Sequence, residues 1–408
     1  MSQSLARRRR DTAVPKAVTT PPRHLLHVFP SFNVGGPQVR FAALAAGLGD
    51  GFHHTVLSLS GRYDAADLLA PTAQVRLYGE PPSAASLPSR LRVYHALLKQ
   101  EQPDLLMTYN WGSTEVAMAN LLLRAPHLHM EDGFGPEERD RQFRRRVWAR
   151  RLFLARSQVV VPSMTLEQIA TRKWRLDPRS VHYIPNGITP KLHPARSIHD
   201  LGLELPAALP RIVWTAALRP EKNPLRMLRA FAPIKDKAVL LIIGSGSERD
   251  AVLREAERLQ LGSSLRMLGG RTDARDIMMQ CDVAALSSDT EQMPLAILEA
   301  MDAGLPVAAC DVGDVRRMLA VQNRPFVTPA SDEAFACALA TLAGNAGLRA
   351  RIGQANRQRL RATFTLGPMI DAYAALLERM TSSARSGPRF RLQEQDGFRR
   401  CAAPATEP

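Results

Sequence analysis

Short apolar runs alternate with amphipathic segments along nearly the whole chain, and this alternation restricts the possible folds more than any other feature. Such alternation is typical of βαβ units, which build parallel sheets. In the first half the runs occupy 24–29, 53–59, 74–77, 104–108, 127–130, 158–161 and 181–184. In the second half they occupy 211–217, 238–243, 265–268, 283–286, 306–309 and 325–327.

Segments with helical periodicity lie between these runs, at 38–48, 87–100, 113–123, 224–234, 248–259, 294–303 and 332–344, and arginine-rich amphipathic helices follow from about 347 to 380. A chain of 408 residues is long enough for two domains of ordinary size. The sequence therefore predicts an α/β protein with two doubly wound parallel sheets, one in each half.

The composition argues against several classes of protein. The four cysteines are scattered without a C-x-x-C pair, which argues against structural zinc and for a reducing compartment. We find no stretch of the ~18 consecutive apolar residues that a transmembrane helix needs, and the arginines at 7–10 are not followed by the apolar core of a signal peptide. We therefore expect a cytoplasmic protein.

The formal net charge of +15 indicates either a polyanionic partner or an arginine-rich composition set by the source genome. Nucleic acid is not expected as the partner, because aromatic residues make up only 6% of the chain and do not interleave with the basic ones. An anionic membrane surface and a phosphorylated substrate remain as candidate polyanionic partners.

Two glutamates lie near the start of a predicted helix in the second half. Glu291 precedes the helix start at Pro294 and Leu295, and Glu299 lies on the helix. Because the helix follows the run 283–286, both carboxylates belong to the carboxyl edge of the sheet, where open α/β sheets bind ligands. A carboxylate accepts hydrogen bonds from vicinal hydroxyls, and the N–H groups of a helix start attract a diphosphate. This predicts a nucleotide-sugar site.

Two cations follow the first run of the second half. Arg219 and Lys222 lie in a loop just before a helix, where the helix dipole disfavours positive charge. That placement favours an anionic ligand, and we predict that the pair neutralises a diphosphate leaving group. Gly244 and Gly246 follow the next run, and they fit either a plain βα turn or a nucleotide contact.

A glycine loop follows the first run of the first half. Gly35 and Gly36 let the backbone approach a ligand, and Pro37 begins a helix whose N-terminus favours an anion. The loop is not G-x-G-x-x-G, and no acidic residue suitably placed for a nicotinamide ribose follows it. This argues against a dinucleotide.

A polar turn follows the run 127–130. Glu131 and Asp132 are flanked by glycine, and we predict that one of them steers an acceptor hydroxyl as a base. His129 either orients a carboxylate or belongs to the core. Asn110 and Trp111 lie in the turn after the preceding run, where the indole offers either a shelf for a sugar or ordinary packing.

The pattern E-x-x-P-L-x-x-L-E-A-M-x-x-G-x-P-V from Glu291 onward, followed by Asp-Val-Gly at 311–313, closely resembles the donor site of family 4 retaining glycosyltransferases of the GT-B fold. The loop at 219–222, the glycine loop and Ile-Pro-Asn-Gly-Ile at 184–188 are similar to segments of the same family. The family usually has Gly-Phe or Gly-Leu after the first glutamate, whereas this chain has Gln292 and Met293.

The resemblance covers 25 to about 380 and implies transfer of a sugar from a UDP- or GDP-linked donor to an acceptor hydroxyl, with retention and an α-linkage. It implies no metal and no cofactor, and no D-x-D follows an apolar run. The implied donor-binding residues are Gly35, Gly36, Arg219, Lys222, Gly244, Gly246, Met293, Pro294, Leu295 and Glu299, with Glu291 catalytic. The rival interpretation on the same architecture is a nucleotide-sugar 2-epimerase.

Five segments are predicted from these patterns. They are a disordered basic arm at 1–22, an acceptor-side domain at 23–190, a donor domain at 191–365, a helix at 366–381 that returns to the first domain, and a polar tail at 382–408.

The segment 139–156 holds eight arginines against one aspartate, with Phe143, Trp148, Leu152 and Phe153 among them. Arginines beside a shared apolar side are typical of an interfacial helix, and the alternative is that the apolar residues face the core and the arginines are solvated. We predict a peripheral location on the inner face of the plasma membrane and a lipid-linked or saccharide acceptor.

Overall fold

The computed structural model describes residues 21–138, 141–191, 197, 200–203, 206 and 208–382. The predicted basic arm up to residue 20, the predicted tail from residue 383 and parts of the first residues of the predicted donor domain lie outside the described residues. Arg139 and Asp140 of the arginine-rich segment also lie outside them.

The first half forms a seven-stranded parallel sheet with the order β3-β2-β1-β4-β5-β6-β7. Its strands are β1 (Arg23–Phe29), β2 (Phe52–Ser58), β3 (Val75–Leu77), β4 (Leu105–Tyr109), β5 (His127–Met130), β6 (Gln158–Val161) and β7 (Val181–Tyr183). The connecting helices are α1 (Gly36–Gly47), α2 (Leu87–Glu101), α3 (Thr114–Leu123), α4 (Arg144–Phe153) and α5 (Met164–Gln168).

The second half forms a six-stranded parallel sheet with the order β10-β9-β8-β11-β12-β13. Its strands are β8 (Arg211–Thr215), β9 (Val239–Ile243), β10 (Leu265–Gly269), β11 (Val283–Leu286), β12 (Val307–Cys310) and β13 (Val327–Thr328). Its helices are α6 (Pro224–Phe231), α7 (Arg249–Arg258), α8 (Ala274–Met278), α9 (Leu295–Ala303), α10 (Val315–Met318), α11 (Asp332–Gly344) and α12 (Ala346–Thr363). Both sheets are doubly wound, as predicted.

The chain crosses between the domains twice, at neighbouring places. The backbone N–H of Ile188 donates to the carbonyl of Phe364, and that of Leu366 donates to the carbonyl of Ile188. A side chain on Gly187 would collide with the carbonyl of Thr365, so this close approach requires glycine. The two crossings therefore form one join.

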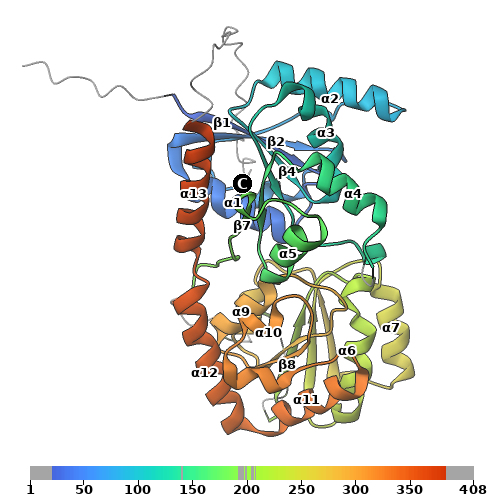
Figure 1. The fold of residues 1–408 in the computed structure, drawn as a ribbon. Coiled ribbons are helices and arrows are strands. Elements are labelled where there is room, and N and C mark those ends of the chain that lie inside the picture. The colour runs from blue at the N-terminus through green and yellow to red at the C-terminus, as the bar shows by residue number, and fades with distance from the viewer. Residues whose placement is uncertain are drawn as a thin grey trace, which may run out of the picture.

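The last helix, α13 (Leu366–Ser382), packs on the first domain rather than the second. Figure 1 shows α12 beside the lower domain and α13, in red, running along the upper one. Its Met369, Tyr373, Leu376 and Leu377 are buried in the same core cluster as Leu25 and Phe41. This packing ties α13 to the first domain.

Candidate active site

The order of the second sheet reverses between β8 and β11, and the loops that follow these two strands lie side by side. Crevices at such a reversal are where open α/β sheets bind ligands. The loop after β8 carries Arg219 and Lys222, and the loop after β11 carries Glu291. Lys222 and Glu291, which are 69 positions apart in the chain, thus lie at the same edge of the sheet.

Lys222 and Glu291 form an ion pair in which Nζ lies 2.6 Å from Oε1. The hydroxyl of Ser288 donates to the same carboxylate oxygen at 2.8 Å. Arg219 is more exposed, and its guanidinium lies 4.0 Å from the carboxylate of Glu221. The carboxylate of Glu291 and the ammonium group of Lys222 therefore lie together where the sequence predicts the sugar and the diphosphate, and Arg219 lies on the same loop as Lys222.

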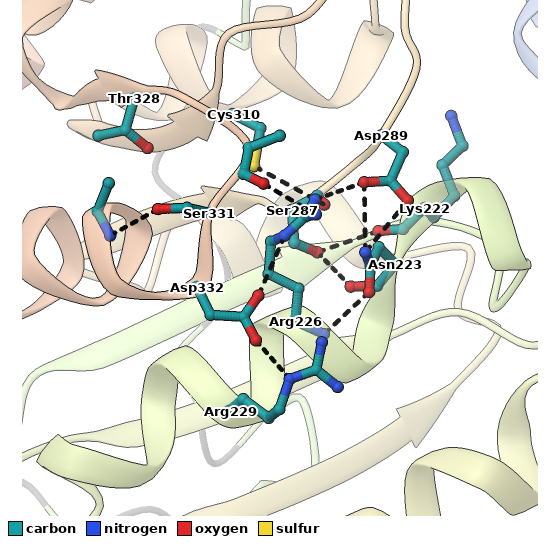
Figure 2. Close-up of polar contacts among 12 residues, drawn as sticks. Lys222, Asn223, Arg226, Arg229, Ser287, Asp289, Cys310, Thr328, Ser331 and Asp332 are labelled. Carbon is teal, nitrogen blue, oxygen red and sulfur yellow. Dashed lines mark hydrogen bonds and ion pairs between the residues drawn. The ribbon is translucent and has the colours of Figure 1, made fainter. Parts of the chain in front are cut away.

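The two loops are joined to each other by a buried polar network (Figure 2). The hydroxyl of Ser287 donates to the carbonyls of Lys222 and Asn223 at 3.0 and 2.9 Å, and it accepts from the indole N–H of Trp214 at 2.9 Å. Figure 2 shows the amide of Asn223 turned toward the carboxylate of Asp289. The network fixes the position of Lys222 relative to the loop that carries Glu291.

Helix α9 begins without a side-chain cap, which leaves its first N–H groups available to an anion. Pro294 is its N-cap and Leu295 its first residue. Further along α9, the half-buried carboxylate of Glu299 makes no hydrogen bond or ion pair with any residue that the structure describes. Burial raises the pKa of Glu299 above its ordinary value, although Arg275 acts in the opposite direction. Such a carboxylate is suited to accept hydrogen bonds from ligand hydroxyls.

Gly244 and Gly246 pack against the loop that follows β8. Both have positive φ, and a side chain on either would collide with a backbone carbonyl, that of Ala216 or that of Leu218. The two glycines thus let their turn pack closely against the loop that carries Arg219. In the first domain, a methyl group on Gly36 would meet nothing within 4 Å, whereas one on Gly35 would meet the side chain of Gln38 at 3.0 Å. A ligand contact at this glycine loop stays a prediction.

Asp132 is held by the buried guanidinium of Arg40 through two hydrogen bonds, one of them 2.8 Å between Nη2 and Oδ2. The side-chain oxygen of Asn110 accepts from the backbone N–H of Asp132 at 2.7 Å. Arg40 also donates to the amide oxygen of Asn186 at 3.2 Å. Asn110 therefore orients the turn of Asp132.

Glu131 is 0% exposed and pairs with the equally buried Arg150, at 3.0 Å between Nε and Oε2. Burial disfavours its charged form, but Arg150 and His129 outweigh this and hold the pKa of Glu131 below its ordinary value. A base must lie within hydrogen-bond reach of the acceptor hydroxyl. This burial does not fit the predicted base role, and His129, itself buried 3.7 Å from Glu131, belongs to the same internal cluster.

The indole of Trp111 contacts arginines. The guanidinium carbons of Arg146 and Arg150 each lie 5.1 Å from its ring centroid. Cation–π contacts of this kind stabilise the ring against α4. Of the two interpretations of Trp111, packing is the one that these contacts support.

Two family models match the chain. One is described as Glycosyl transferase 4-like domain and matches residues 35–187, and the other as Glycosyl transferases group 1 and matches residues 203–359. The chain belongs to the group 1 glycosyl transferases. The resemblance seen at the donor-site pattern is confirmed.

Known glycosyltransferases resemble the chain over much of its length. The UDP-Gal:alpha-D-GlcNAc-diphosphoundecaprenol alpha-1,3-galactosyltransferase of Escherichia coli is 30% identical over 53% of this chain and 60% of its own length. A D-inositol 3-phosphate glycosyltransferase of Stackebrandtia nassauensis is 24% identical over 70% of this chain and 68% of its own. HepE of Anabaena, crystallised with UDP and glucose, is 19% identical and superposes with a TM-score of 0.76 over 88% of this chain and 100% of its own. This likeness confirms the GT-B fold.

The two domains of this glycosyltransferase meet at the residues where it departs from the family pattern. The hydroxyl of Ser163 donates to the side-chain oxygen of Gln292 at 2.9 Å. The side-chain amide of Asn186 donates to the carbonyl of Met293 at 2.9 Å. Met293 is buried, and its sulfur accepts from the backbone N–H of Asn186 at 3.1 Å.

A second contact between the domains lies at the start of α5. Asp314 of the second domain accepts from the backbone N–H groups of Met164 and Thr165 at 2.7 and 3.1 Å. An acidic group at a helix N-terminus is stabilised by the helix dipole. Sequence reasoning missed this contact, since nothing in the sequence pairs residues 149 or 150 positions apart.

Within the described part of the glycosyltransferase, no group of three or more histidine, cysteine, aspartate or glutamate side chains is arranged to hold a metal ion. Among the same residues, no helix combines the length and the apolar composition needed to cross a bilayer.

Proposed function

We propose that this glycosyltransferase transfers a sugar from a UDP- or GDP-linked donor to an acceptor hydroxyl, with retention of the α configuration. The observation that carries the proposal is the Lys222–Glu291 pair, held where the order of the donor-domain sheet reverses. The start of α9, which has no side-chain cap, and the carboxylate of Glu299, which pairs with none of the described residues, complete the proposed site for a diphosphate, a sugar and a ribose.

Each part of the site has a chemical task. Lys222 and Arg219 offset the charge that develops on the leaving diphosphate, and Glu291 accepts hydrogen bonds from the sugar. The acceptor oxygen bonds to the anomeric carbon as the bond to the diphosphate breaks. The acceptor proton passes to an oxygen of the leaving diphosphate on the same face. Asp132, fixed by Arg40, orients the acceptor from the first domain.

A panel of UDP- and GDP-sugars incubated with the purified protein tests this proposal. We expect hydrolysis of one donor in the absence of acceptor, and faster release of its nucleoside diphosphate with acceptor. NMR of the product distinguishes the rival isomerase, because a 2-epimerase would return a donor with inverted C2 and an intact diphosphate bond. No reaction with any donor would contradict the proposal.

We predict that EDTA leaves the rate of transfer unchanged. Lys222 and Arg219 supply the positive charge that a divalent ion gives in metal-dependent enzymes. Rates measured after extensive EDTA dialysis, with and without added Mg²⁺ or Mn²⁺, check this. A complete loss of activity that the metal restores would show that the two cations do not suffice.

The acceptor proposal rests on the relatives and on α4. The Escherichia coli relative is named for a diphosphoundecaprenol acceptor, and a further relative from Rhizobium meliloti for lipopolysaccharide core biosynthesis. We therefore propose a lipid-linked or saccharide acceptor in cell-envelope synthesis. On α4, Trp148 and Leu152 are 61% and 64% exposed, which favours a membrane contact over core packing.

The arginines of α4 divide into two groups. Arg146 pairs with Glu137 and Glu138, and Arg150 is buried, so these two point inward. Arg144 and Arg145 are exposed and Arg151, half-buried, stacks on Trp148 at 5.2 Å. The outward group beside the exposed apolar side chains is the candidate membrane surface.

We predict that changing Arg144, Arg145 and Arg151 to serine weakens flotation with phosphatidylglycerol vesicles about 10²-fold, since each basic residue near an anionic leaflet contributes about 1 kcal/mol. Binding should also fall steeply with salt. A control variant changes the exposed Arg254, Arg351 and Arg361 of the second domain to serine and removes the same charge. Equal losses in both variants, or equal binding to neutral vesicles, would refute a membrane surface on α4.

A further inference from the structure

Arg226 lies in the first turn of α6 and is 7% exposed. Its Nη1 donates to the carbonyl of Ser287 at 2.9 Å and to the carboxylate of Asp289 at 2.6 Å. Its Nη2 donates to the carbonyl of Ala330 at 3.2 Å, and its Nε to the carboxylate of Asp332 at 3.3 Å. Figure 2 shows one guanidinium at the centre of these segments. It fixes α6 to the residues that follow β11 and β13.

The partners of Arg226 are themselves joined. The side-chain amide of Asn223 donates to Asp289 at 3.1 Å, and its oxygen accepts from the backbone N–H of Arg226 at 3.0 Å. Asn223 has a φ of 45°, a left-handed conformation that this cap stabilises. The backbone N–H of Asp289 donates to the carbonyl of Glu221 at 2.9 Å. Arg226, Asp289 and Asn223 therefore form one closed network between the two donor loops.

The network lies next to the proposed reacting groups in the chain. Asn223 directly follows Lys222, and Asp289 stands two residues before Glu291. A shift of Asp289 or Asn223 therefore moves the backbone that carries the ion pair. Because transfer depends on the placement of reacting groups, a displacement of about 1 Å can cost about 10²-fold in rate.

We infer that Arg226 is a positioning residue of the transfer reaction, which acts through Asp289 and Asn223 to set the separation of Lys222 and Glu291. This inference rests on the proposed function. Arg226 does not touch the substrate, because its guanidinium is surrounded by Ser287, Asp289, Ala330 and Asp332. Lysine cannot replace it, because one ammonium group does not reach partners on both sides of a planar fork.

The test compares Arg226→Lys with Arg229→Lys. Arg229 lies one turn further along the same helix and also pairs with Asp332, but it is partly exposed and does not contact Asp289. We expect Arg226→Lys to lower kcat about 10²-fold while the Kd for UDP or GDP changes less than about threefold. Arg229→Lys should stay within about twofold of the wild type in both. Asp289→Asn keeps the side-chain shape and should behave like Arg226→Lys. If the Arg226→Lys protein does not fold, Asp289→Asn serves as the test variant instead.

Two results would overturn the inference. One is an Arg226→Lys protein that has a lower melting temperature but, when assayed below that temperature, the wild-type kcat per nucleotide-binding site. That result would show that Arg226 supports the fold alone. The other is a crystal structure of this variant in which Lys222 Nζ and Glu291 Oε1 keep their separation of 2.6 Å. A wild-type protein that uses no donor would instead refute the proposed function, and the crystal structure would still decide the role of Arg226.

Discussion

Replacing Glu291 with alanine is expected to lower the rate of sugar transfer by more than about 10²-fold, as the loss of a charge-stabilising group commonly does. Its carboxylate is held by Lys222 and Ser288 at 2.6 and 2.8 Å, so it stands in a fixed position before any donor arrives. Glu291→Gln keeps the shape and removes the charge. We expect it to retain donor binding better than the alanine variant and to remain slow in turnover.

Lys222→Ala is expected to cost a similar factor, because it removes the cation nearest the leaving diphosphate. Lys222 and Glu291 contact each other, so their effects should not add. The double variant is therefore expected to be about as slow as the slower single variant. Steady-state rates with the preferred donor measure all three.

The control for these variants is Glu333→Gln, an exposed carboxylate near the start of α11. It should leave turnover unchanged. Correctly folded Glu291→Ala or Lys222→Ala protein with near-wild-type turnover would refute the assignment of the donor site. Fully additive effects would show that the two residues act on separate steps.

The sheets could be predicted from the sequence because central strands such as β9, β11 and β12 are buried apolar runs. Runs 127–130, 158–161 and 283–286 coincide with β5, β6 and β11. The short helices α5, α8 and α10 were not predicted, since four or five residues are too few to show helical periodicity. Their positions follow from packing, as at α5, whose start lies on Asp314 of the other domain.

The donor loops could be predicted because strand ends in a parallel sheet meet at one edge. The turn that contains Glu131 was harder to predict. The environment of Glu131 depends on Arg150, which lies on α4, 19 positions away in the chain. Nothing in the residues around Glu131 signals that partner. Arg226 did carry a signal, because an arginine in the first turn of a helix opposes the helix dipole and needs a local anion.

Acid is expected to unfold the first domain before the second, because the first sheet buries histidines that the second lacks. Burial lowers the pKa of His24 and His54 to about 4 and that of His127 to about 3. Burial also holds the pKa of His27 well below its ordinary value. From 201 to 365 the sequence contains no histidine. The pH dependence of stability should therefore arise in the first sheet.

The sign follows from proton uptake on unfolding. Each of these histidines is neutral in the folded domain but titrates near pH 6.5 in the unfolded chain, so the unfolded state gains protons as the pH falls below about 6.5. Stability is thus full above that pH and declines toward about pH 4, near the folded values of His24 and His54. His24, His54 and His127 each cost about 2 kcal/mol by pH 5 and together on the order of 6 kcal/mol, and His27 acts in the same direction. That is comparable to the whole stability of a typical domain.

Denaturant unfolding followed between pH 7.5 and 5, with hydrogen exchange to locate the change, measures this effect. We expect strands β1, β2, β4 and β5 to lose protection while β8, β9 and β11 keep theirs. His127→Gln offers its side-chain amide to Thr108 and Ser157, the hydrogen-bond partners of His127, and removes one titrating group. It should reduce the slope of unfolding free energy against pH by about 1.4 kcal/mol per pH unit between pH 6 and 4. A stability that stays flat from pH 7 to 5, or a second sheet that opens first, would show that the buried histidines do not govern the acid response.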